Sequence, residues 1–112
     1  MDRGPGAGPA VDVEAVAQRA LRCRSVARIS TGTFGEVATY LPGRRVPGVR
    51  VGDGRLEIHV VACWGAEVPA LAGEVRDALR PLAGDLPIDV HVDDVDVPDA
   101  VNGAQIFLPD TE

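Results

Sequence analysis

The sequence contains no lysine and few aromatic residues, which make up only 4% of its 112 positions. With so few rings available, the core has to be built from Val, Leu, Ile and Ala. Hydrophobic residues still account for 46% of the chain, a fraction typical of globular proteins, which argues against disorder throughout. The length suits one domain with one modest core.

Basic residues are absent from the last part of the chain. Residues 1–80 hold all 11 arginines and nine acids, whereas residues 81–112 hold eight acids and no base. An acidic segment of this kind repels phosphate backbones, so nucleic acid is not expected as a partner. The formal net charge of −6 favours solubility.

Long apolar runs and clustered cysteines are also missing. The longest apolar run, Val60 to Trp64, is far shorter than the ~20 residues of a membrane span, so direct membrane insertion is not expected. No signal peptide is recognised at the start of the chain. Cys23 and Cys63 stand alone, without a second ligand at metal-binding spacing, and are predicted to be the reduced thiols of a cytoplasmic protein.

Two amphipathic helices are predicted. Asp12 can cap the first, over residues 12–23. The second, over residues 68–83, has Pro69 in its first turn and stops at Gly84. The predicted apolar stripes are Val13, Val16, Ala17, Ala20 and Leu21 in the first helix, and Val68, Leu71, Ala72, Val75, Leu79 and Leu82 in the second.

Strands are predicted between and after these helices. Residues 26–30 and 36–41 are short β-branched runs, and residues 52–54 (Gly-Asp-Gly) form a hairpin turn before the strongest strand. In that strand Leu56, Ile58, Val60 and Ala62 point to one face, and Arg55, Glu57 and His59 to the other. A last strand begins at Ile88, and the doubled Asp93-Asp94 marks a bulge or its end.

These elements predict an α+β fold. Two amphipathic helices cannot bury their stripes alone, but one apolar sheet face can cover both. We therefore expect a two-layer sandwich, with both helices on one face of a small, three- to five-stranded mixed sheet. The predicted organisation is a disordered leader (1–10), a single domain (11–97) and a C-terminal tail (98–112).

Three motifs, in a fixed order, carry a family resemblance. Residues 48–51 (Gly-Val-Arg-Val) are similar to a Gly-Val-x-Val motif, and the strand 56–62 runs into Trp64-Gly65 and a helix start. Residues 88–95 (IDVHVDDV) are similar to a closing Val-Asn-Val-x-Val-x-Gly-Val. Over about residues 11–97 the chain thus resembles the alkaline-shock-protein family of bacterial envelope-stress proteins.

The chain departs from that family pattern at named positions. Trp64 stands where Tyr or Phe is usual, Asp89 where Asn is common, and Asp94 where Gly is common. Ser25-Val26 replaces an early Gly-Val. The resemblance implies a small cytoplasmic protein without catalysis or cofactor, which associates with itself and with a membrane-anchoring partner in envelope homeostasis.

The outward side of the strongest strand, together with the tryptophan at its end, is a candidate interaction surface. It comprises Arg55, Glu57, His59, Val61 and Trp64. Arg55 could pair with an aspartate of a second copy, which would make the protein a homo-oligomer. Trp64 has two interpretations that the sequence leaves open, an exposed partner contact or core packing.

The two histidines, His59 and His91, offer an alternative. If their strands are neighbours, the imidazoles can meet close to Asp89 and Asp93 and bind Zn²⁺. Two ordinary surface histidines is the favoured interpretation, because no ligand pair lies on one element. The Gly-containing loop of residues 31–36 lacks the lysine and spacing of a phosphate loop, and is interpreted as a turn.

Three functions are therefore weighed. The first is a non-enzymatic accessory protein of the cell-envelope stress response, which acts through protein–protein interaction. The second is a small regulator of a metabolic enzyme complex, such as fatty-acid synthesis. The third is a metal-binding protein or enzyme that uses His59 and His91.

Overall fold

The structure is a computed structural model that describes residues 11–32 and 34–98. The predicted leader (1–10) and all but the first residue of the predicted tail lie outside the described residues. Within them the fold is α+β, as predicted, with two helices and six strands. No helix in this part of the chain has both the length and the apolar character to cross a bilayer.

Both predicted helices are present. Helix α1 (Val13–Leu21) starts after Asp12, whose side chain accepts a hydrogen bond from the backbone N–H of Ala15 at 3.1 Å. It is slightly shorter than predicted, because Asp12 caps it and the chain leaves the helix at Arg22. Helix α2 (Val68–Ala83) has the predicted bounds, and Gly84 ends it with a positive φ of 63°.

Strand β5 (Arg55–Cys63) is the centre of a four-stranded mixed sheet. On one side it pairs antiparallel with β4 (Val49–Gly52) along its first half and with β1 (Val26–Ile29) near its end. On the other side it pairs in parallel with β6 (Ile88–Asp96) along its whole length. The β4–β5 turn is the predicted one, with positive φ at Asp53 and Gly54.

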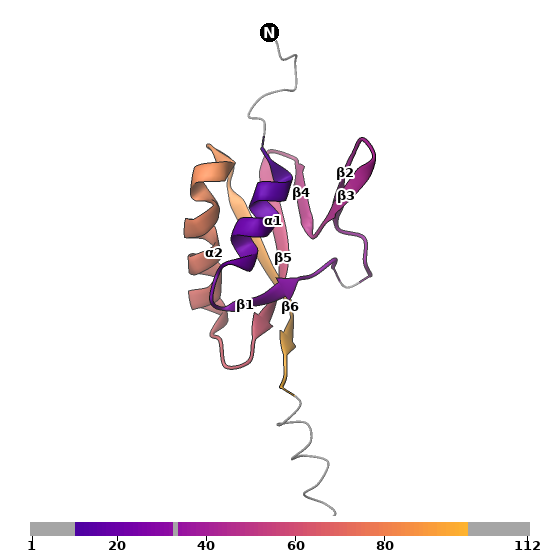
Figure 1. The fold of residues 1–112 in the computed structure, drawn as a ribbon. Coiled ribbons are helices and arrows are strands. Elements are labelled where there is room, and N and C mark those ends of the chain that lie inside the picture. Colours follow the sequence, from indigo (N-terminus) through magenta and orange to yellow (C-terminus); the bar gives the residue numbers. More distant parts are fainter. Residues whose placement is uncertain (1–10, 33, 99–112) are drawn as a thin grey trace, which may run out of the picture.

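A separate two-stranded hairpin lies beside this sheet. It consists of β2 (Ala38–Leu41) and β3 (Arg44–Pro47), joined by Pro42-Gly43. Gly48, with a φ of 82°, separates β3 from β4. Figure 1 shows the hairpin to one side of the two helices and the main sheet.

The core fills the space between the helices and one sheet face. Of the side chains predicted to meet there, Leu56, Ile58, Val60, Val75 and Leu79 are fully buried, and Val49 of β4 and Leu71 of α2 are buried with them. Val90 and Val92 pack against this core but are only partly buried, because β6 is an edge strand. The register leaves the opposite sheet face, called the outer face below, to the polar residues of β5 and β6.

Candidate functional site

The outer face brings together side chains that are far apart in the sequence. The parallel register places Glu57 opposite Asp89 and His59 opposite His91. Antiparallel pairing with β4 adds Arg50 next to Glu57. The sequence predicted the outward direction of the β5 residues, and the structure adds the neighbours from β4, β1 and β6.

Arginines on this face are already paired within the chain. Arg55 donates to both carboxylate oxygens of Asp89, at 2.6 and 2.7 Å. Arg50 donates to Glu57 at 3.0 Å. Within the chain Arg55 is thus paired with Asp89, and its pairing with an aspartate of a second copy stays a prediction.

His59 is the buried polar residue of the outer face. It is only 8% exposed, although it was predicted to be an ordinary surface histidine. Its Nδ1 lies 2.9 Å from Oδ2 of Asp93, and its Nε2 lies 2.6 Å from Oε2 of Glu57. The hydroxyl of Ser30 donates to the same Asp93 oxygen at 2.7 Å. Ser30 was not predicted, because its contact depends on the pairing of β1 with β5.

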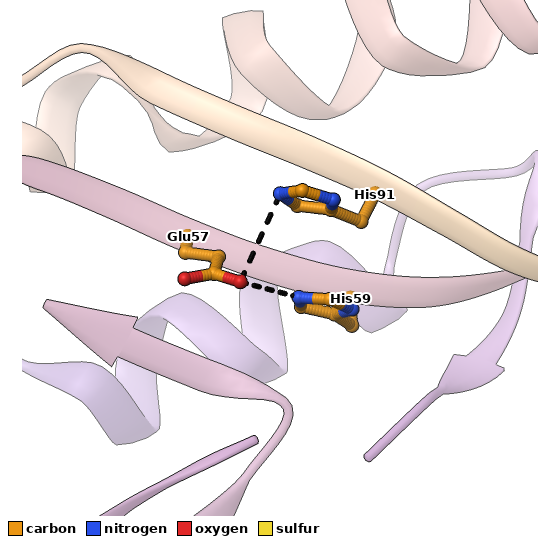
Figure 2. Close-up of side chains that lie close together, drawn as sticks. All are labelled: Glu57, His59 and His91. Carbon is orange, nitrogen blue, oxygen red and sulfur yellow. Dashed lines mark hydrogen bonds and ion pairs between the residues drawn. The ribbon is translucent and has the colours of Figure 1, made fainter. Parts of the chain in front are cut away.

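His91 covers His59. The two rings are stacked, with centroids 4.3 Å apart and an angle of 2° between their planes. Nε2 of His91 lies 3.8 Å from Oε2 of Glu57, and its side chain is 47% exposed. Figure 2 shows both rings directing a nitrogen toward the Glu57 carboxylate, so the expectation that the imidazoles meet is correct.

The carboxylates of this cluster are held in their charged form. Burial raises the pKa of Glu57, but hydrogen bonds from His59 and Arg50 lower it by more, so its pKa lies below the usual value. Asp93 behaves alike: burial raises its pKa, and bonds from Ser30 and His59 outweigh that effect.

The cluster lacks the arrangement of a hydroxyl nucleophile and its base. Ser30, the hydroxyl that reaches the cluster among the described residues, donates to Asp93 rather than to a histidine. A nucleophilic serine would need an imidazole to take its proton. The geometry suits ion pairing and ligand binding better than acyl transfer.

An open pocket of about 430 Å³ lies beside the cluster. Asp93 and Asp94 line it with Arg28, Thr31 and Gly32. Two carboxylates against one guanidinium make this pocket a poor site for phosphate.

Exposed apolar side chains gather at the C-terminal end of β5. Trp64 follows the strand and is 56% exposed, and Val68, 49% exposed, starts α2. Val95 of β6 is 39% exposed and lies opposite Ala62, near the same end. We call these three residues the Trp64 patch. Val61, predicted to contribute to this exposed spot, is buried at 4% exposure.

The aromatic residues outside the core were only partly anticipated. Phe34 is 87% exposed and Tyr40 is 72% exposed, so with Trp64 every aromatic residue in ranges 11–32 and 34–98 is more than half exposed. From the sequence, an exposed position was considered for Trp64 alone. Phe34 and Tyr40 carried no signal, since short strands and loops do not reveal which side faces solvent.

Comparison with known proteins found no similar protein. No protein-family model matches the chain, and neither the curated proteins nor the solved structures that were searched contain a match.

Proposed function

We propose that this chain is a non-catalytic, cytoplasmic accessory protein of the bacterial cell-envelope stress response, which associates with a second copy and with protein partners through the Trp64 patch. A membrane-anchored partner would recruit it to the envelope. The resemblance of residues 48–95 to the alkaline-shock-protein motifs supports the biological role, and the surface of the fold supports the mode of action.

The observation that carries the proposal is the exposure of the aromatic residues. Aromatic side chains are among the largest apolar groups, and a core that excludes them forgoes their burial. Here Trp64, Tyr40 and Phe34 lie on the surface while Val, Leu, Ile and Ala fill the interior. Aromatic residues are enriched in protein interfaces and in their energetic hot spots.

Charge on the outer face favours the Trp64 patch over that face as the main contact. Arg50 and Arg55 are held by Glu57 and Asp89 of the same chain. Exchanging these ion pairs for ion pairs with a partner would add little binding energy, because each exposed pair contributes only about 0–1 kcal/mol. Apolar area at Trp64, Val68 and Val95 has no such competitor and can supply the binding energy.

Sedimentation across a concentration series tests self-association. The wild-type chain is expected to shift from monomer to dimer as its concentration rises. Trp64→Ala should weaken the dimer by at least about 30-fold, the effect of losing a hot-spot residue. Val51→Ala is the matched control, because Val51 is 40% exposed but lies opposite Leu56, toward the other end of β5. A wild-type chain that stays monomeric, or equal losses in both variants, would contradict the proposed interface.

Cell fractionation tests recruitment to the envelope. No helix in the described residues is long and apolar enough to span a bilayer, and the proposal assigns membrane association to a membrane-anchored partner. The chain is expected in the membrane fraction, to be released by an alkaline carbonate wash without detergent. Recovery entirely in the soluble fraction under envelope stress would contradict this part of the proposal.

A further inference from the structure

We propose that Glu57, His59 and His91 form a binding site for one divalent transition-metal ion of the Zn²⁺ type, which would tie β5 to β6. This site is independent of the Trp64 patch, because it lies on the outer face in the middle of the two strands.

The ligand atoms already lie close together. One nitrogen from each imidazole and one oxygen from Glu57 all fall within 4.8 Å of one another. Oε2 of Glu57 is the common neighbour, 2.6 Å from Nε2 of His59 and 3.8 Å from Nε2 of His91. Two imidazoles and one carboxylate form a set of three protein ligands that zinc uses in open sites, with water in the fourth position.

A second layer of contacts orients His59 for this role. Metal-binding histidines usually donate their other ring N–H to a carboxylate. Here Nδ1 of His59 faces Asp93, which Ser30 in turn holds at 2.7 Å. This leaves Nε2 directed at Glu57 and His91. Arg50 donates twice to the other oxygen of Glu57, Oε1, at 3.0 and 3.2 Å, and once to Oε2 at 3.2 Å, while Oε2 is the Glu57 oxygen that faces both rings.

Small side-chain movements are needed for an ion to enter. Two ligand atoms on one zinc ion lie roughly 3.3 Å apart, so Glu57 has to withdraw slightly from His59. The parallel rings also cannot both direct their lone pairs at one point, so His91 has to turn. His91 is free to do so, because nearly half of its side chain is exposed. The ion then replaces the proton between His59 and Glu57, which passes to solvent.

The chemistry of the ligands limits the choice of ion. Imidazole nitrogens favour Zn²⁺, Cu²⁺, Ni²⁺ and Co²⁺, whereas Ca²⁺ and Mg²⁺ need more oxygen ligands. Zn²⁺ is therefore the probe for affinity, and Co²⁺, which absorbs visible light, is the probe for coordination.

Calorimetric titration of the untagged chain with zinc chloride tests the site. We expect one ion per chain, with a dissociation constant of roughly 1–10 µM. Binding should raise the melting temperature by roughly 5–15 °C at a hundredfold excess over that constant. Cobalt should give visible bands typical of nitrogen and oxygen ligands, without a thiolate charge-transfer band.

Variants separate this site from adventitious binding. His91→Ala is the main test, since His91 is exposed and its loss should leave the fold intact; we expect zinc affinity to fall at least about tenfold. Glu57→Gln should weaken binding as well. Cys63→Ser and Asp96→Asn are the controls, and they should bind as the wild type does. Absence of saturable zinc binding to the wild type would overturn the proposal, and so would equal affinity in His91→Ala.

Discussion

Gly48 is a position where the backbone conformation and the packing both exclude a side chain. It lies between β3 and β4 with a φ of 82°, and its N–H and C=O bond to Val37 and His59. A side chain here would fall 2.6 Å from the carbonyl oxygen of Ser30 and would overlap Ile29. The position therefore requires glycine both for its conformation and for its close packing.

Replacing Gly48 tests this requirement. Gly48→Ala is expected to destabilise the chain by at least about 3 kcal/mol, because positive φ and steric overlap both oppose the methyl group. Gly43→Ala is the matched control, since Gly43 has a φ of 79° but no atom within 4 Å of an added Cβ. The control should lose only about 1 kcal/mol. Urea denaturation measures both, and equal losses would show that crowding at Gly48 is not significant.

His59 shows where prediction from single residues ends. The alternation of β5 indicated correctly that His59 points away from the core. Its burial could not be predicted, because it depends on stacking with His91 and on contacts with Glu57 and Asp93, which come partly from another strand. For the same reason the sequence allowed a histidine pair but could not include Ser30 in the cluster.

At the scale of elements, the two helices were the most predictable parts. Their apolar stripes, the cap at Asp12 and the stop at Gly84 are all local signals, and they define α1 and α2 closely. The β2–β3 hairpin was only half predicted. Its first strand falls within the predicted run 36–41, but the exposed Arg44 and Arg45 of β3 gave no alternation to identify the second.

Helix α2 should contribute much of the core stability. Leu79 is fully buried between the helix and the sheet, so Leu79→Ala is expected to cost roughly 2–5 kcal/mol through lost burial and a cavity. Arg80→Ala changes the next, exposed residue of the same helix and should stay within about 0.5 kcal/mol of the wild type. A Leu79→Ala urea melt that matches the wild type would show that this helix packs differently.

Glu74 links α2 to the turn after α1 and should make stability depend on pH. Hydrogen bonds from Ser25, and also from the backbone N–H of Arg24, hold the pKa of Glu74 below its usual value. The charged form is thus favoured by folding, and its contribution is present above the unfolded pKa and lost as pH falls through the folded one.

Glu74→Gln isolates this contribution. The variant should be less stable than the wild type at neutral pH, and the difference should shrink as the pH falls below about 4. Asp77→Asn, which removes an exposed carboxylate from the same helix, is the matched control for the loss of one charge. Free energies of unfolding from urea melts at several pH values give the comparison; a constant Glu74→Gln difference at every pH would contradict this account.

For the whole molecule, the layered α+β architecture was predicted, but the order of its strands was not. Local patterns identify strands, whereas their pairing depends on contacts between distant residues. The sequence allowed β5 and β6 to be neighbours but did not predict that they pair in parallel. This pairing decides which side chains share the outer face. The Trp64 patch likewise depends on where β5, α2 and β6 end relative to one another.

The central claim is that Trp64 forms a contact between chains, and its own fluorescence tests this most directly. Trp64 is the only tryptophan, so the emission of the chain reports a single site. We expect the emission maximum to move to longer wavelength as the protein is diluted from roughly 100 µM to 0.1 µM, because Trp64 passes from an interface into water. An emission maximum typical of water-exposed tryptophan at every concentration would contradict the proposal.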